Sequence, residues 1–173
     1  PGLLGLLHCS VSDLKKIHGI GTVKAVQLKC IGELSKRIAS TAARISLDFN
    51  SPDSIAAYYM EDMRYYRQEH LKLLMLNTRS RLIGESEISR GTVNMSVISP
   101  RELFIEALQK NAVYIILLHN HPSGDPMPSR EDILVTQRIR EGGSLLGIEL
   151  LDHIIIGDNC YVSLAEQKLL KEK

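Results

Sequence analysis

Two histidines separated by one residue, followed by a serine and an aspartate, are the part of this sequence best suited to chemistry. His119 and His121 end an apolar run, and Ser129 and Asp132 follow a loop rich in proline and glycine. Side chains alternate along a strand, so both imidazoles would project to the same side and could share a metal. Two imidazoles and one carboxylate leave the fourth position of a tetrahedral zinc open for water, as in catalytic sites. The segment therefore predicts a hydrolytic zinc site.

Each half of this pattern also has a simpler interpretation. A His-x-His pair such as His119 and His121 can be an ordinary pair of surface side chains. Ser129 followed three residues later by Asp132, before an apolar helix, also fits a helix capping box. The capping box and the metal site are compatible. His153, on a later apolar stretch, is a further candidate ligand, but a structural or supporting role fits its surroundings better.

The elements that position these residues follow from periodicity and turn residues. The apolar run 113–118 is typical of a central strand buried on both faces, and a helix is expected over 130–141 after the loop 120–128. Two apolar runs at 71–77 and 82–89, broken by a polar turn, predict a hairpin. The other expected elements are helices at 52–66 and 100–109, strands at 148–156 and 161–163, and a short terminal helix. Together they predict an α/β fold, with a mixed sheet flanked by helices.

A small helical module is expected ahead of this domain. The boundaries predicted from the sequence are 1–46 for the module and 50–173 for the main domain. Within the module, helical spacing of apolar residues favours short helices at 12–17 and 22–38. Because the chain starts with proline and residues 2–7 look like the tail of a helical unit, we expect a fragment of a longer protein with a truncated module.

The turn between the two expected helices looks like a helix-hairpin-helix element. Gly19 and Gly21 would let the backbone approach a phosphate at the start of the following helix, where Lys24 adds a positive charge. This arrangement favours sequence-independent DNA contact. The alternative is a hairpin used for packing or protein interaction, because the module has no aromatic residues to stack on bases.

Composition narrows the class of protein. A hydrophobic fraction of 44% in 173 residues is enough for a buried core, and the longest apolar runs are far shorter than the roughly 20 residues of a membrane span. The three cysteines have no paired spacing, which favours a reducing compartment, so we expect a cytoplasmic protein with no membrane partner. Residues 1–50 hold seven Lys and Arg against three acidic residues, a weak signal for phosphate contact. The sequence does not indicate an oligomeric state.

The spacing of the candidate site resembles a known motif. His119-x-His121, seven residues, Ser129, two residues and Asp132 match the full JAMM motif of the MPN-type metalloproteases. The flanking sequence is similar to one branch, the bacterial RadC proteins, over nearly the whole chain. The segments that carry this similarity are residues 91–94, 100–102, 119–124, 128–132 and 151–155. The resemblance implies an MPN/JAMM fold, related in architecture to cytidine deaminases.

The resemblance also implies roles for individual residues. His119, His121 and Asp132 would be the ligands of one zinc ion per chain, which lowers the pKa of its bound water. Ser129 would donate a hydrogen bond to the oxyanion that forms on the substrate. A glutamate near the first strand would be the general base, and we assign that role to Glu69.

Two other glutamates compete for the role of base. Glu85 and Glu87 lie on the second expected strand, whereas Glu69 lies just before the first, where the family has its glutamate. The simpler interpretation of Glu69 is a solvated acid at a helix end, because position alone does not show that it reaches a metal-bound water.

Two functions are consistent with the sequence. The first is a zinc-dependent hydrolase of the JAMM type, a peptidase or isopeptidase-like enzyme whose partner is a peptide or isopeptide substrate. The alternative is a DNA-repair-associated, nucleic-acid-binding factor with a non-peptidase or vestigial metal site. The metal motif favours the hydrolase more strongly than the hairpin favours DNA.

Overall fold

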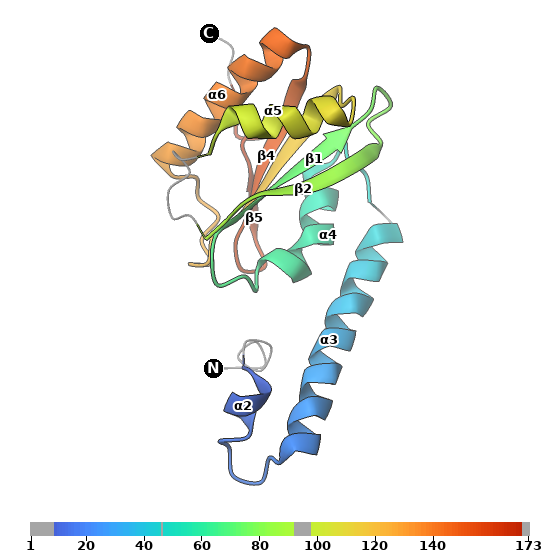
Figure 1. Ribbon diagram of the computed structural model, residues 1–173, viewed down its shortest axis with the longest axis vertical. Coiled ribbons are helices and arrows are strands. Elements are labelled where there is room, and N and C mark those ends of the chain that lie inside the picture. Colours follow the sequence, from blue (N-terminus) through green and yellow to red (C-terminus); the bar gives the residue numbers. More distant parts are fainter. Residues whose placement is uncertain (1–8, 46, 92–97, 171–173) are drawn as a thin grey trace. The chain divides into compact units, whose positions relative to one another are not determined.

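The chain divides into two compact units, Pro1–Ser46 and Leu47–Lys173. The computed structural model describes residues 9–45, 47–91 and 98–170 (Figure 1). The expected helical tail at residues 2–7 and part of the RadC-like segment 91–94 therefore lie outside the described residues. Among the described residues, no helix is both long and apolar enough to cross a membrane.

The first unit consists of a one-turn helix and a long helix. Helix α2 (Val11–Leu14) begins at a capping box formed by Ser10, and α3 spans Thr22–Ile45. Between them Gly19 has φ +83°, a left-handed conformation that glycine adopts without strain. The first helix is shorter than the predicted 12–17, because the chain turns after Leu14. The second continues beyond the predicted end at residue 38.

The second unit is built on a five-stranded sheet with the strand order β2-β1-β3-β4-β5. Its strands are β1 (His70–Leu76), β2 (Leu82–Arg90), β3 (Tyr114–Asn120), β4 (Glu149–Ile156) and β5 (Tyr161–Ser163). β3 and β4 are parallel and the other neighbours are antiparallel, so the predicted mixed sheet is confirmed. The pairing of β2 with β1 shifts register twice, between Leu71 and Lys72 and between Met75 and Leu76.

Three helices cover the two faces of the sheet. Helix α4 (Pro52–Met63) packs on one face, whereas α5 (Pro100–Gln109) and α6 (Arg130–Leu146) pack on the other (Figure 1). The central strand β3 contributes to both cores: Ile115 and Leu117 contact the α5 and α6 side, and alternate residues contact the α4 side. The prediction of a strand buried on both faces is confirmed.

Helix α6 is longer than expected. The predicted end at residue 141 is wrong, because the helix continues through Gly142 and Gly143 to Leu146 and is capped by Gly147, which has φ +70°. Gly143 lies where the helix meets the start of β4, and its carbonyl oxygen accepts a 2.8 Å hydrogen bond from the backbone N–H of Ile148. The absence of a side chain at Gly143 allows this close approach.

The expected terminal helix is also wrong within the described residues. Residues 164–168 form turns and not a helix. Lys168 has φ +57°, and the N–H of Leu169 bonds back to the carbonyl of Leu164, which closes the segment after a single turn. A left-handed residue at this point prevents the helical hydrogen bonding from continuing.

The close contact of Gly143 gives a stability prediction. A Cβ atom at this position would lie 2.2 Å from the carbonyl oxygen of Ile148. We therefore expect Gly143→Ala to lower the free energy of unfolding by about 1–3 kcal/mol, measured by urea denaturation, despite the helical preference for alanine. Ser144→Ala, at an exposed position in the same turn, is the control and should change little. A Gly143→Ala protein at least as stable as wild type would contradict this account of the helix end.

Candidate metal centre

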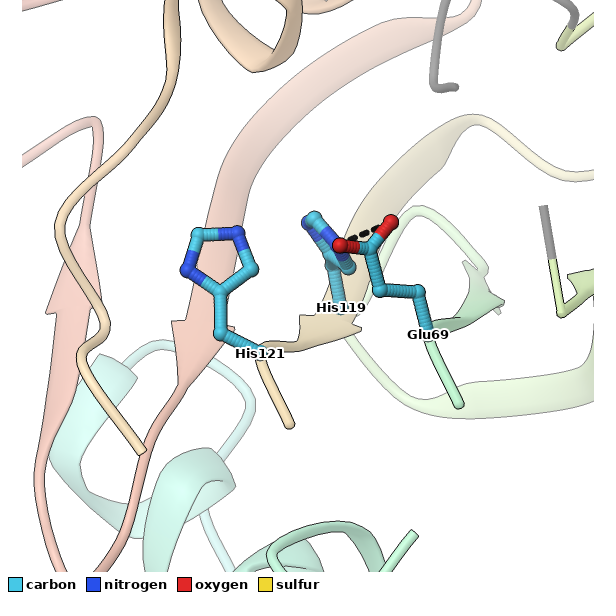
Figure 2. A group of neighbouring side chains, drawn as sticks. All are labelled: Glu69, His119 and His121. Atoms are coloured by element: carbon cyan, nitrogen blue, oxygen red, sulfur yellow. Dashed lines mark ion pairs between the residues drawn. The ribbon is translucent and has the colours of Figure 1, made fainter. Parts of the chain in front are cut away.

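Four side chains from three separate parts of the second unit converge at one end of β3. Glu69 directly precedes β1, His119 and His121 lie at the end of β3 and just after it, and Asp132 is in the first turn of α6. Glu69, His119 and His121 each present a potential ligand atom, and these atoms all lie within 4.8 Å of one another. Figure 2 shows the Glu69 carboxylate beside the His119 ring, with Oε2 4.0 Å from Nε2.

Asp132 joins this cluster through both histidines. Its Oδ1 lies 3.5 Å from Nδ1 of His119, and its Oδ2 lies 3.4 Å from Nε2 of His121. Burial opposes ionisation of this carboxyl group, but contacts with His121 and Ser129 outweigh it and hold the pKa of Asp132 well below its usual range. The cluster therefore contains a carboxylate at neutral pH, as a cation site requires.

Several polar atoms of the cluster are buried without hydrogen bonds. Both ring nitrogens of His119 and Oδ1 of Asp132 have no partner among the described residues. Leaving such atoms unsatisfied typically costs 1–3 kcal/mol each. Burial also lowers the pKa of His119 to about 4, so its ring is neutral and keeps a lone pair. Neutral imidazole and carboxylate donors suit a divalent metal, and a metal would contact one His119 nitrogen and Oδ1 of Asp132, so these residues fit a metal site.

His121 is oriented by the loop that follows it. Its Nδ1 lies 2.8 Å from the carbonyl oxygen of Asp125. A carbonyl oxygen only accepts, so Nδ1 must carry the hydrogen, which leaves Nε2, 3.4 Å from Oδ2 of Asp132, as the ring atom able to bind a metal. A metal-binding histidine is commonly fixed by such a hydrogen bond from its other ring nitrogen. The Asp125 carbonyl was not predicted from the sequence, because backbone groups carry no signal in residue type.

The loop after His121 is in turn held by the end of β4. The N–H of His121 donates to the carbonyl of Ile156, and the N–H of Asp158 donates to the carbonyl of Gly124, both at 2.9 Å. A Cβ atom on Gly157 would lie 2.3 Å from the Gly124 oxygen, so glycine permits this contact. The position of His121 thus depends on the parallel pair β3 and β4.

Ser129 forms the capping box that was the simpler interpretation of its spacing. Its Oγ accepts from the N–H of Asp132, and both its N–H and its hydroxyl donate to Oδ2 of Asp132, each at 2.7 Å. These bonds use Oδ2 and leave Oδ1 without a partner. The cap therefore orients the carboxylate, and in this structure the Ser129 hydroxyl is directed to Asp132.

The three candidate glutamates differ in what their side chains contact. Glu69 lies in the cluster, and burial raises its pKa above the usual value of 4.5. Glu85 instead accepts hydrogen bonds from Tyr59 and Lys72, and Glu87 lies 2.8 Å from Nδ1 of His70. Only Glu69 of the three belongs to the group of potential metal ligands found among the described residues.

His153 lies next to His119 but does not belong to the group of potential metal ligands Glu69, His119 and His121. Its ring stacks on His119 with centroids 5.8 Å apart, and burial lowers its pKa to about 3. Thr136 Oγ1 donates to the carbonyl of Asp132, so the Nδ1–H of His153 donates to Thr136 Oγ1 at 2.6 Å. Thr136 thus connects the His153 ring to the backbone of Asp132, a role that we did not predict. Its position four residues after Asp132, on the same helix face, was the available signal.

The residues proposed for DNA contact lie in the first unit. Gly19 and Gly21 are exposed in the turn before α3, and the ammonium group of Lys24 donates to the carbonyl of Gly19 at 3.2 Å. Lys24 thus closes the turn in this structure. DNA contact through these residues stays a prediction.

Comparison with known proteins agrees with this architecture. Residues 49–169 match the model of the RadC-like JAB domain. UPF0758 proteins are 50% identical to this chain in Desulfitobacterium hafniense (strain DSM 10664 / DCB-2) and 48% in Clostridium acetobutylicum. Both alignments cover 98% of this chain and 74% of the relative. The chain belongs to the RadC-like JAB domain family, as its motifs predicted.

Proposed function

We propose that this chain is a zinc-dependent hydrolase of the JAMM type that cleaves amide bonds in a peptide or isopeptide substrate. The observation that supports this most is the set of buried, unpartnered donor atoms on His119 and Asp132 beside Glu69. A merely structural cluster would be expected to pair such atoms with one another. Buried polar atoms without a hydrogen-bond partner are explained if a metal ion contacts them.

Zinc is the metal that this donor set favours. Two imidazoles and one carboxylate are typical of catalytic zinc sites, whereas magnesium and calcium prefer sites made of oxygen ligands alone. His119, His121 and Asp132 would hold the ion. When bound, it would supply a Lewis acid that polarises a carbonyl group and lowers the pKa of water.

The remaining residues would carry the proton and the developing charge. Glu69 would accept a proton from the attacking water and pass it to the leaving amine as the C–N bond breaks. Ser129 would donate its hydroxyl to the oxyanion, a contact typically worth about 3–4 kcal/mol in the transition state. For this the hydroxyl must turn from Asp132, whose Oδ2 would still accept from the backbone N–H of Ser129.

Direct assay of amide hydrolysis tests the proposal. We expect the zinc-loaded chain to cleave members of a mixture of linear peptides and peptides joined through a lysine side chain. Mass spectrometry would detect products that together contain one added water. A chelator should stop the reaction and added zinc should restore it, because three ligands and an open position are needed. A folded, zinc-loaded chain that cleaves no member of either substrate class would contradict the proposed activity.

A further inference from the structure

Asn120, between the two histidines, makes contacts that its sequence position does not explain. The residue is 1% exposed. Oδ1 accepts a 2.8 Å hydrogen bond from the backbone N–H of His70, and Nδ2 donates a 3.1 Å bond to the carbonyl of Gln68. These partners define the amide orientation, because an N–H only donates and a carbonyl only accepts. Asn120 therefore bridges the two residues on either side of Glu69.

The contact lies where regular strand pairing stops. The ladder between β1 and β3 has Leu71 opposite His119 as its last pair at this end. One residue further, the side-chain amide of Asn120 replaces the backbone group that would otherwise continue the pairing. The carbonyl of Glu69 also accepts a 2.8 Å bond from the N–H of Gly91. Three successive backbone groups around Glu69 are therefore held.

We infer that Asn120 is the positioning residue that holds the Glu69 carboxylate against His119, an inference that rests on the proposed role of Glu69. Asn120 is bonded covalently to both histidines, so its amide links the location of Glu69 to the location of the ligands. An asparagine can do this because its side chain offers one donor and one acceptor at a single fork. Aspartate has the same shape but no donor for the Gln68 carbonyl, and alanine has neither group.

Amide hydrogen exchange measured by NMR tests the clamp itself. In Asn120→Ala we expect the protection of the His70 amide to fall roughly five- to tenfold, as for loss of one buried hydrogen bond. Asn120→Asp retains the acceptor and should keep most of that protection. This second variant keeps the test decisive if the alanine variant misfolds. Protection of the Leu73 and Leu74 amides reports that β1 is intact. Unchanged His70 protection in Asn120→Ala would overturn the inference.

The position of the Glu69 carboxylate is the second measurement. In protein loaded with Co²⁺, the pseudocontact shift of the Glu69 side-chain carboxyl carbon depends on its place relative to the metal, and Glu69→Gln assigns the signal. We expect this shift to change in both Asn120 variants. The matched control is Asn77→Ala, at the other end of β1. It removes an asparagine whose Oδ1 accepts from the backbone N–H groups of Arg79 and Arg81. It should leave the Glu69 signal in place. An unmoved Glu69 signal in the Asn120 variants would also overturn the inference.

Kinetics separate this inference from the proposed function. On a cleaved peptide, Asn120→Ala should lower kcat about tenfold or more with zinc content unchanged, and add no further loss in a Glu69→Gln background. Equal losses in both backgrounds would show that Asn120 does not act through Glu69. If the wild-type chain cleaves nothing, the proposed function fails, whereas the exchange and shift measurements still decide whether Asn120 holds Glu69.

Discussion

Replacing His119 or His121 by alanine will reduce bound zinc from about one ion per chain to background in protein purified without chelator. Each substitution removes one of two imidazoles that lie in the cluster with the Asp132 carboxylate. The fold should persist, because two separate apolar cores on the faces of the sheet do not depend on the metal. Metal content measured by mass spectrometry, with circular dichroism of the same samples, gives the result.

A buried histidine outside the cluster provides the control. The ring of His70 is held by Glu87 and stacks on Tyr66. His70→Ala should therefore keep its zinc. Zinc should also raise the stability of wild type, by roughly 4 kcal/mol at a free concentration 1,000 times the Kd, and not that of the His119 variant. Unchanged zinc in both the His119 and His121 variants would remove the site from consideration.

Glu69→Gln is expected to separate metal binding from catalysis. A base that is not a ligand can lose its charge without releasing zinc, so metal content should stay at the wild-type value. Hydrolysis of a cleaved peptide should fall by about 100-fold or more, because glutamine cannot accept the proton. Asp132→Asn should instead weaken zinc binding, since it replaces an anionic ligand by a poor neutral one.

Glu85→Gln is the matched control for the loss of a carboxylate. Its side chain contacts Tyr59 and Lys72 and not the cluster, so activity and zinc content should both be close to wild type. Loss of zinc in Glu69→Gln would show that Glu69 is itself a ligand, which its distance from His119 and His121 also allows. Full activity in Glu69→Gln would exclude it as the base.

The parts of the structure that local patterns encode could be predicted from the sequence. The hairpin of β1 and β2 follows from two apolar runs around a polar turn. The burial of β3 on both faces follows from a continuous apolar run. Strand alternation predicts that His119 and His121 project to the same side, and the spacing after the loop predicts Asp132 in the first turn of a helix. These are short-range constraints that residue type and spacing express directly.

The remaining features depend on contacts between distant segments. The side chain of Asn120 bonds to the backbone of Gln68 and His70, about fifty positions earlier in the chain. The residues around Asn120 in the sequence do not indicate these partners. The end of α6 was mispredicted for a local reason: the left-handed residue that stops the helix is Gly147, and the N–H of Ile148 then bonds to the carbonyl of Gly143 within the same helix end.

The two edges of the sheet affect how the protein behaves at high concentration. Edge strand β2 has two register shifts against β1 and carries Glu85 and Glu87, and the opposite edge, β5, is three residues long. An aggregating chain adds to a sheet most readily along a flat, regular and uncharged edge. The sheet is therefore poorly suited to edge-to-edge aggregation.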